Sequence, residues 1–200
     1  MRQLKVNHRN NFYTIVGSRK APPRANLLLT KAVGRLEEKG FIGRSGDCPT
    51  GPDTALNLGL KDVCNGEFYV PNADHKGFSD GSYTIDVSQL SNCDQAMAMA
   101  ESVHPAWDRC NEWARELHGR NPYQVLGRNL DTPSLFLLTW APLKGNKTMH
   151  VTGGTATAVS IAIRYNVPIW NVSIPSHREH IEKFVDGHPV RLFTKRIMLS

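Results

Sequence analysis

A glycine pair followed by small, hydroxyl-bearing residues fills positions 151–159, which read Val-Thr-Gly-Gly-Thr-Ala-Thr-Ala-Val. The stretch comes after an apolar, strand-like run and before an amphipathic run that predicts a helix. A turn of this composition exposes backbone N–H groups at a helix N-terminus, where a phosphate or a carboxylate binds favourably. The stretch therefore predicts a strand–turn–helix unit with an anion-binding turn.

Strand-like and helix-like segments alternate along the rest of the chain. β-Favouring runs predict strands at 12–16, 41–44, 67–71, 134–140 and 167–172. Apolar residues at helical spacing, together with capping residues such as Ser176, predict helices at about 25–40, 54–59, 92–103, 107–117, 156–165 and 176–184. The periodicity is lost between 72 and 90, which predicts a long loop or a small insertion. The run 134–140 is the most hydrophobic and should lie centrally in the sheet.

This alternation predicts an α/β fold, in which a Rossmann-like, doubly wound and mostly parallel sheet is flanked by helices. The two helices around 92–120 form a helical insertion into that pattern. With 200 residues, 40% of them apolar, the chain can bury a substantial core, and a single domain spanning 1–200 is expected. In such a fold a ligand binds in the crevice at the carboxyl ends of the strands.

The composition narrows the class of protein. No apolar run approaches the roughly 18 residues that a membrane span requires, so no membrane partner is expected. The segment 1–11 lacks the apolar centre of a signal peptide, and the four cysteines form no C-x-x-C pair, so reduced thiols and a cytoplasmic location are expected. The formal net charge of +6 suits an anionic partner but is spread along the chain.

Three glycine-containing turns, at 17–19, 44–53 and 153–157, should meet at the crevice because each follows a strand and precedes a helix. Each supplies backbone donors and short hydroxyl side chains of the kind that hold a phosphate. The candidate ligand-binding residues are Gly17, Ser18, Arg19, Arg44, Ser45, Gly46, Asp53, Thr139, Trp140, Gly153, Gly154, Thr155 and Thr157.

Several of these candidates have a structural role as an alternative. Arg19 and Arg44 suit a bidentate contact with phosphate, or else a pairing with a carboxylate. Asp53 suits ribose hydroxyls, or else capping of the helix that follows it. Thr139 and Trp140 suit a hydroxyl contact and a stacking contact with a base, although an indole ring is commonly a core residue.

The sequence gives little support for a metal site or for a catalytic nucleophile. The histidines form no H-E-x-x-H motif and the spacing of His177 and His180 is only weakly suggestive, so neither a metal nor a cofactor is expected. Cys48 lies within the second turn without an evident partner base and is interpreted as a small loop residue. The segment that contains His104, Trp107 and Asp108 is a candidate lid over the crevice.

The same turns carry a family resemblance. Ile15-Val-Gly-Ser-Arg19, Arg44-Ser-Gly-Asp-Cys-Pro-Thr-Gly-Pro-Asp53, and Gly153-Gly-Thr-Ala-Thr157 followed by Val167-Pro-Ile-Trp-Asn171 resemble the SLOG superfamily. That group contains the lysine-decarboxylase-like phosphoribohydrolases and the DNA-processing protein A family. With His104-Pro-Ala-Trp-Asp108 inserted, the arrangement is similar to small phage-encoded members. The resemblance covers 12–172 and implies a Rossmann-like fold whose loops bind a nucleotide or a nucleotide-derived ligand.

One departure from that family bears on mechanism. The phosphoribohydrolases have a proline before the glycine pair, and a glutamate on the following helix that assists cleavage of the N-glycosidic bond. Thr152 and Ser160 stand at these positions here. Without that carboxylate, acid–base catalysis has no evident agent, so binding is favoured over hydrolysis.

The resulting hypothesis is a non-catalytic protein that senses or sequesters a nucleotide-derived small molecule, such as an ADP-ribose-like or cyclic nucleotide immune signal. As a phage protein it would counter host defence in the host cytoplasm. One alternative is a phosphoribohydrolase-like enzyme that cuts the N-glycosidic bond of nucleoside monophosphates or NAD, with Asp53, Asp108 or Glu112 replacing the glutamate. Another is a single-stranded DNA-binding protein, which the dispersed charge supports weakly. Apolar surface around 104–117 suggests a homo-oligomer.

Overall fold

The structure is a computed structural model that describes residues 10–79, 81–145, 151 and 153–190. Two parts of the chain that entered the sequence predictions, Thr152 and the segment 1–9, lie outside the described residues.

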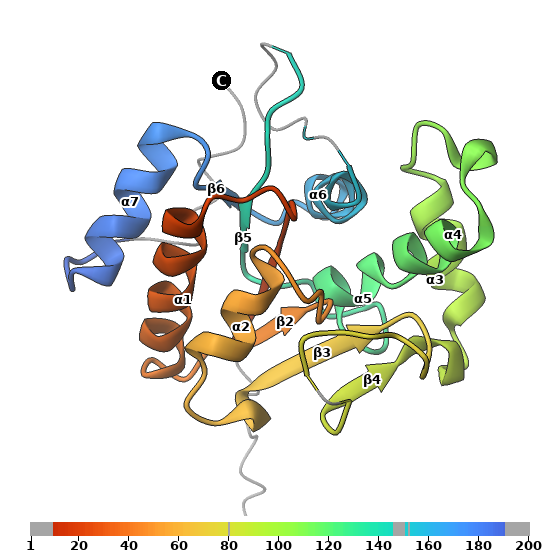
Figure 1. Ribbon diagram of the computed structural model, residues 1–200, viewed down its shortest axis with the longest axis horizontal. Coiled ribbons are helices and arrows are strands. Elements are labelled where there is room, and N and C mark those ends of the chain that lie inside the picture. The colour runs from red at the N-terminus through yellow and green to blue at the C-terminus, as the bar shows by residue number, and fades with distance from the viewer. Residues whose placement is uncertain (1–9, 80, 146–150, 152, 191–200) are drawn as a thin grey trace, which may run out of the picture.

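A six-stranded sheet forms the centre of the molecule, with strand order β4-β3-β2-β1-β5-β6 and parallel pairing between all neighbours. The strands are β1 (Phe12–Gly17), β2 (Ile42–Ser45), β3 (Gly66–Val70), β4 (Thr84–Asp86), β5 (Leu137–Trp140) and β6 (Ile169–Asn171). The chain moves outward from β1 to β4 and then returns to place β5 on the other side of β1 (Figure 1). This reversal between β1 and β5 is the switch point of a doubly wound sheet, so the predicted Rossmann-like α/β fold is confirmed.

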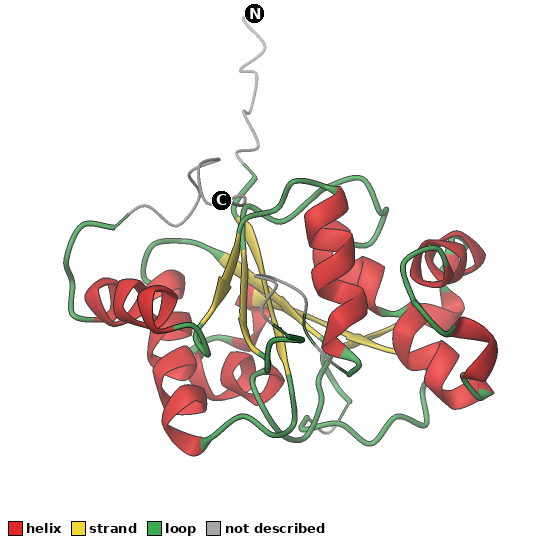
Figure 2. Ribbon diagram, turned by 90° about the horizontal axis from the view of Figure 1, so that it is seen from above, coloured by secondary structure: helices red, strands yellow, loops and turns green. Residues whose placement is uncertain are grey.

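Helices cover both faces of the sheet (Figure 2). One face carries α1 (Pro23–Glu37), α2 (Asp53–Gly59) and α7 (Pro175–Val185). The other carries α3 (Cys93–Glu101), α5 (Asn121–Leu126) and α6 (Thr155–Arg164), with α4 (Glu112–Gly119) packed on α3. Short 3-10 turns complete the described elements: η1 (Val63–Asn65), η2 (Val87–Gln89) and η3 (Trp107–Arg109). Over the described residues, no helix is long and apolar enough to cross a membrane.

Successive side chains of a strand point to opposite faces of the sheet, so each face carries its own hydrophobic core. In β1, Tyr13 and Ile15 belong to the core beneath α1, α2 and α7, whereas Val16 belongs to the core beneath α3, α5 and α6. The Tyr13 ring stacks on Phe136, with 5.6 Å between the ring centroids. Because the strands are parallel, the carboxyl ends of β1, β2 and β5 lie at one edge of the sheet. The first two glycine turns begin there, and β5 ends there 13 residues before Gly153.

Two regions differ from the sequence predictions. The region 72–90, expected as a loop or small insertion, contains η2 and the edge strand β4, whose three residues Thr-Ile-Asp carry too short a pattern to be recognised. The helix expected at 107–117 is broken at Cys110, and Asn111 then caps α4 by accepting a hydrogen bond from the N–H of Ala114 at 2.9 Å.

Two helices of the structure, α5 and α7, also differ from the sequence predictions. α5 lies where no helix was expected, because Pro122 in its first turn gives a short element the look of a loop. Ser176 does not cap α7: the helix starts at Pro175, and no side chain caps it. Proline is favoured at that position because the N–H it lacks would have no partner within the helix.

Candidate functional site

One carboxylate joins the turn after β1 to the turn after β2. We call residues 17–19 the β1 turn and residues 44–53 the β2 turn. Asp53 accepts a hydrogen bond from the backbone N–H of Gly17 at 3.2 Å and another from that of Gly46 at 3.3 Å. Its side chain is buried, so the two turns are fixed relative to each other without help from a ligand.

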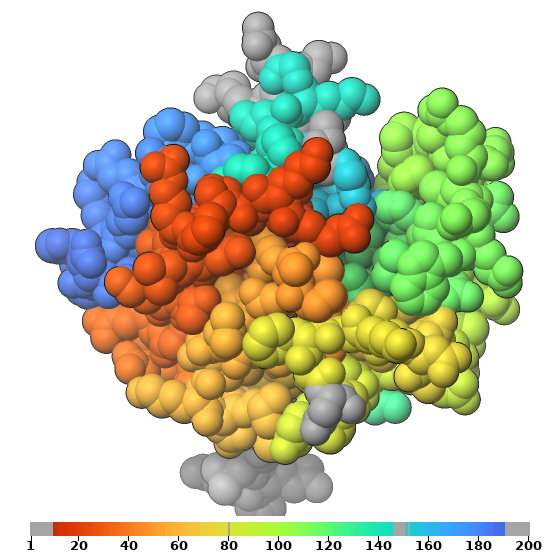
Figure 3. Space-filling model, viewed as in Figure 1, coloured from red at the N-terminus to blue at the C-terminus, as the bar shows by residue number. Residues whose placement is uncertain are grey.

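Close backbone packing reinforces this link. Gly51 has φ of +82°, and a Cβ there would lie 2.8 Å from the carbonyl oxygen of Ser18. A Cβ on Gly17 would overlap the ring of Pro52. In the space-filling view, the segment after β1 (red) lies across the segment after β2 (orange), with α6 (blue) beside its end (Figure 3). Glycine is therefore required at both positions for steric reasons.

Asp53 has a different role from either alternative that the sequence offered. It is the first residue of α2, the N-cap is Pro52, and no side chain caps the helix. Both of its carboxylate oxygens accept a backbone donor, so the side chain holds the two turns together instead of reaching toward a ribose. Burial raises the pKa of Asp53, while Arg120 and the backbone donors oppose that rise.

Two adjacent residues at the start of α5 join the β2 turn to the turn before α6, which we call the α6 turn (153–157). The Arg120 guanidinium donates to the carbonyl oxygen of Gly46, and its Nη1 lies 3.5 Å from that of Tyr69. The Asn121 side-chain amide donates to the carbonyl oxygen of Gly154 at 3.2 Å. The structure thus brings all three predicted turns to the same edge of the sheet. Of the residues that connect them, Asp53 was among the predicted site residues, whereas Arg120 and Asn121 were not.

The α6 turn is open to a ligand. Gly153 has φ of +79°, and Gly154 is the N-cap of α6 with no side-chain cap and no acidic residue in the first turn. Both glycines are exposed, and no described atom lies within 4 Å of where a Cβ would stand on either. The next residue, Thr155, is buried. This helix N-terminus therefore offers free backbone donors and the positive end of its dipole to an anion.

Arg120 is a buried cation without an ion-pair partner among the described residues. Its relative exposure is 8%, and no described carboxylate oxygen lies within 4.0 Å of its guanidinium. Burial lowers the pKa of Arg120, and the more distant negative charges of Asp53, Cys48 and Asp47 oppose that shift. A buried cation that lacks a carboxylate favours the approach of an anion from outside the chain.

Unpartnered polar atoms gather at the same place. The Nε atom of Arg120 and both side-chain polar atoms of Gln124 are buried without a hydrogen-bond partner in the described structure. Both side chains occupy the space beside Gly46 that a Cβ would fill. The hydroxyl of Thr139, one strand away on β5, is also buried and unpartnered. Buried polar groups usually have partners, so this cluster indicates a ligand or water site.

Arg44 does not reach the crevice, which corrects its assignment as a phosphate contact. Its Nε donates to Glu67 at 2.7 Å, Nη1 donates to the carbonyl oxygen of Thr132 at 2.7 Å, and the guanidinium lies 3.8 Å from the centre of the Phe12 ring. Phe12 is the first residue of β1, so the side chain points toward the amino ends of the strands. Arg44 therefore has the alternative role considered for it, a pairing with a carboxylate, here that of Glu67.

Trp140 also faces away from the crevice. Its ring packs against the core beneath α1 and α7, and its backbone carbonyl accepts a hydrogen bond from the N–H of Ser18 at 2.9 Å. The Ser18 hydroxyl in turn accepts one from the N–H of Lys20 at 3.2 Å, and Arg19 is exposed. Arg19 thus remains the free cation of the β1 turn, whereas Trp140 has the core role that an indole ring commonly takes.

The candidate lid packs against His118 of α4, which in turn contacts α6. His104 lies 5.9 Å from Trp107 and 4.4 Å from His118, between ring centroids, and Asp108 is exposed. His118 is anchored by its Nδ1 atom, 2.8 Å from the hydroxyl of Thr157 in the α6 turn. Burial, with smaller contributions from His104 and Arg120, lowers the pKa of His118 to about 4. The segment is therefore linked to the α6 turn through His118, and its rings contact one another.

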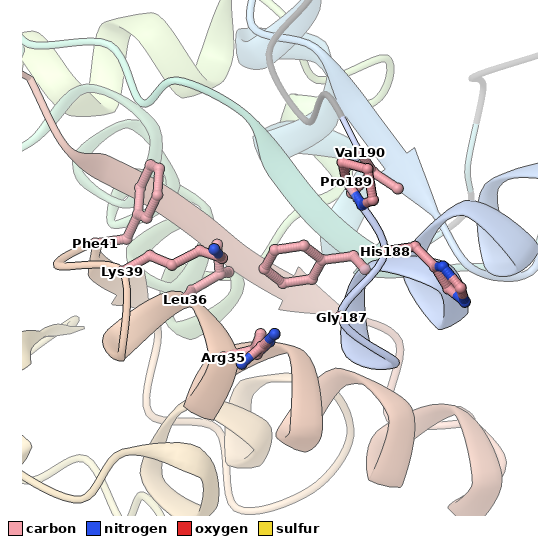
Figure 4. Close-up of a pocket in the computed structure, with 9 residues that line it drawn as sticks. Arg35, Leu36, Lys39, Phe41, Gly187, His188, Pro189 and Val190 are labelled. Carbon is pink, nitrogen blue, oxygen red and sulfur yellow. The ribbon is translucent and has the colours of Figure 1, made fainter.

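A cavity of about 380 Å³ lies at the opposite edge of the sheet (Figure 4). It opens between the end of α1 and the end of α7, and its lining includes Arg35, Phe41, Phe184 and His188. Phe41 directly precedes β2, so this cavity lies at the amino ends of the strands, where none of the predicted site residues falls. A second cavity, of about 300 Å³, lies beyond the carboxyl end of β3 and includes His75.

Comparison of the chain with protein-family models, with curated proteins and with solved structures finds no match.

Proposed function

We propose that this protein binds a nucleotide-derived anion at the carboxyl edge of its sheet and does not hydrolyse it. The observation that carries the proposal is the adjacent pair Arg120 and Asn121, which connects the β2 turn to the α6 turn. This pair puts a buried cation without a carboxylate partner next to an open helix N-terminus. Both features favour a phosphate, and together they form a site that a neutral ligand would not need.

A nucleotide fits this edge better than a bare phosphate does. The exposed Arg19 on the β1 turn offers a further bidentate contact. The unpartnered amide of Gln124 and hydroxyl of Thr139 are suited to a ribose or a base, which carry both donors and acceptors. The resemblance of the three turns to the SLOG superfamily supports the same ligand class.

The chemistry of α6 supports binding over cleavage. Ser160 occupies the helix position at which the related hydrolases carry their glutamate, and a hydroxyl does not stabilise an oxocarbenium ion as a carboxylate does. Asp53, one of the carboxylates that the hydrolase alternative puts in its place, is engaged with two backbone donors. Asp108 and Glu112 are both exposed on the insertion. In this reading the protein senses or sequesters its ligand, and the likeness to phage-encoded members favours a role against host defence.

Isothermal titration calorimetry of the full chain against AMP, ADP, ADP-ribose, NAD and cyclic dinucleotides tests the proposal. We expect at least one of them to bind well below a Kd of about 1 mM, which corresponds to about −4 kcal/mol. No binding below that concentration by any of them would contradict the proposal.

Chromatography of the same mixtures after long incubation separates binding from hydrolysis. We expect every nucleotide to be recovered unchanged. Release of a free base would instead support the hydrolase alternative, and replacing Asp108 and Glu112 in turn would then identify the carboxylate responsible.

A further inference from the structure

Two imidazoles and one thiol converge on a point beside the α6 turn. His104 follows α3, Cys110 lies between η3 and α4, and His118 is near the end of α4. One ligand atom from each of the three lies within 4.8 Å of the other two. The Cys110 sulfur is 3.8 Å from Nδ1 and 3.9 Å from Nε2 of His104. All three side chains are partly buried, so the cluster lies beneath the surface and still within reach of solvent.

Both imidazole rings also contact the Trp107 ring, with 5.9 Å from His104 and 6.3 Å from His118 between centroids. The Cys110 sulfur lies 3.7 Å from the carbonyl oxygen of Ala106, whose N–H donates to Nδ1 of His104 at 3.3 Å. Nδ1 of His118 is occupied by the hydroxyl of Thr157, which leaves its Nε2 free. The thiol and His104 share a weak sulfur hydrogen bond, and no hydrogen bond among the described residues joins His118 to either of them.

We propose that His104, Cys110 and His118 bind a zinc ion. A thiolate with two imidazoles is a donor set that zinc prefers, and three protein ligands leave a fourth position for water. In a tetrahedral zinc site the donor atoms lie about 3.3–3.6 Å apart, as follows from bond lengths of about 2.0–2.3 Å. The Cys110 sulfur lies 3.9 Å from Nε2 of His104, within a few tenths of an ångström of this value, and the pairs that include His118 lie within 4.8 Å.

Thr157 would act as an outer-sphere partner of the ion. Metal-bound histidines usually hold their second ring nitrogen with a hydrogen bond, which fixes the ring orientation and the tautomer. Here the Thr157 hydroxyl lies 2.8 Å from Nδ1 of His118, so the ring nitrogen directed toward the thiol is Nε2. Zinc binding would displace the thiol proton to solvent and bind the resulting thiolate.

The placement gives the ion a structural consequence. All three ligands belong to the insertion between α3 and α5, whereas Thr157 belongs to α6. An ion there would tie the insertion together and hold it against the α6 turn. The inference stands independently of the proposed nucleotide site, because it requires no ligand at the crevice.

Cobalt substitution of the full-length protein tests the site directly. Protein stripped with a chelator is titrated with Co²⁺ and followed by the thiolate-to-cobalt charge-transfer absorption, and Zn²⁺ is then added in competition. We expect one equivalent of Co²⁺ to give the band, and one equivalent of Zn²⁺ to remove it with a Kd below about 1 μM. Absence of the band, or a stoichiometry well above one, would overturn the proposal.

Matched variants assign the ligands. Cys110→Ser should abolish the band, and His104→Gln and His118→Gln should each weaken zinc binding by more than about 100-fold, the upper range for an outer-sphere partner. Thr157→Val should weaken it by about 10-fold. Cys64→Ser is the control, because Cys64 is exposed and lies on η1, and it should leave both metals unaffected.

Circular dichroism of each stripped variant separates lost binding from lost folding. If Cys110→Ser fails to fold, the two histidine variants decide the question through zinc competition alone. Zinc affinity in folded His104→Gln and His118→Gln equal to that of the unaltered protein would refute the assignment. Nucleotide titration of the stripped protein is measured separately, so failure of one site is not mistaken for failure of the other.

Discussion

Gly154 is the residue at which charge can be tested with least risk to the fold. Its φ of −57° suits any residue, and no described atom lies within 4 Å of where a Cβ would stand. Gly154→Asp places a negative charge where the phosphate should bind, and we expect nucleotide affinity to fall at least ten-fold, or about 1.4 kcal/mol. Calorimetry with the tightest ligand measures the loss.

The isosteric Gly154→Asn is the matched control, because it adds the same volume without the charge. It should retain affinity within a few-fold. An aspartate at a helix N-terminus interacts favourably with the dipole by about 0.3–1 kcal/mol, so Gly154→Asp should not unfold the protein. Equal affinity in the two folded variants would remove the α6 turn from the site.

Substitution of Arg44 should affect the stability of the protein, whereas substitution of Arg19 should affect nucleotide binding. The Arg44 side chain is 3% exposed and pairs with Glu67, which is 27% exposed. Removing one partner of a buried pair costs about 3–5 kcal/mol, and partial hydration of Glu67 places Arg44→Met at about 3 kcal/mol. Urea unfolding measures this loss, while nucleotide affinity of the folded variant should be unchanged.

The converse holds for Arg19→Met. Because Arg19 is exposed, this substitution should change the protein's free energy of unfolding by less than about 0.5 kcal/mol, while nucleotide affinity falls. If Arg44→Met weakened binding without destabilising the protein, our assignment of the two arginines would be reversed.

The contrast between Arg44 and Arg120 shows what the sequence could reveal at this scale. An arginine followed by Ser-Gly at the end of a strand looks like a ligand contact, but its direction depends on which face of the sheet the strand register assigns to it. Arg44 falls on the face that Glu67 and Thr132 occupy. Arg120 has no motif at all, and only the packing of α5 brings it to Gly46.

The contact between α7 and β6 should make stability depend on pH. His177 of α7 accepts a hydrogen bond at Nδ1 from the N–H of Asn171 in β6 at 3.1 Å, which requires a neutral ring. Burial, with a contribution from His180, lowers the pKa of His177. The unfolded chain, with an ordinary value of about 6.5, therefore takes up a proton first, and stability is lost as the pH falls below about 6.5.

Urea unfolding at about pH 7.5 and at about pH 5.5, on either side of that ordinary value, measures this dependence. In His177→Asn the side-chain oxygen can still accept from the Asn171 N–H but cannot be protonated, so the loss of stability should be smaller. Some dependence should remain, because burial also lowers the pKa of His118 and of His75. An unchanged dependence in His177→Asn would contradict the role given to this residue.

The length of each helix or strand determined whether it could be predicted from the sequence. Strands and helices with a clear period, such as β1, α1 and α6, were located to within a few residues, since each carries enough apolar positions to define a face. β4 has three residues and α5 has six, of which all six are buried, so neither shows an amphipathic pattern. Asn121 and Gln124 belong to α5, and Arg120 directly precedes it. The sequence analysis missed these site residues for the same reason that it missed the helix.

The whole-molecule charge bears on the choice between a small ligand and a nucleic acid. A net charge of +6 favours anions in general, but a single-stranded DNA-binding protein needs a groove that tracks several phosphates. If the site accepts one nucleotide, an oligonucleotide of about ten nucleotides should bind no more tightly than the best mononucleotide. The logarithm of affinity should fall with the logarithm of salt concentration with a slope no steeper than about −1 to −2, as for one or two phosphates.

Fluorescence anisotropy with labelled ligands over a salt series measures both quantities. A steep slope together with tight oligonucleotide binding would favour the DNA-binding alternative. Insensitivity of that binding to Arg19→Met would further show that the oligonucleotide lies away from the crevice.

The expectation of a homo-oligomer stays a prediction. Trp113 on α4 is 47% exposed and stacks at 6.1 Å on His75, so the insertion presents an aromatic ring on its outer face. Light scattering during gel filtration would establish the oligomeric state.

The close packing of Gly17 on Pro52 has a kinetic consequence. That contact and Asp53 hold two of the three turns of the proposed site in place, so little ordering of the β1 and β2 turns should accompany nucleotide binding. Association should then be rapid and similar for all nucleotides that fit, and differences in affinity among them should appear as differences in residence time.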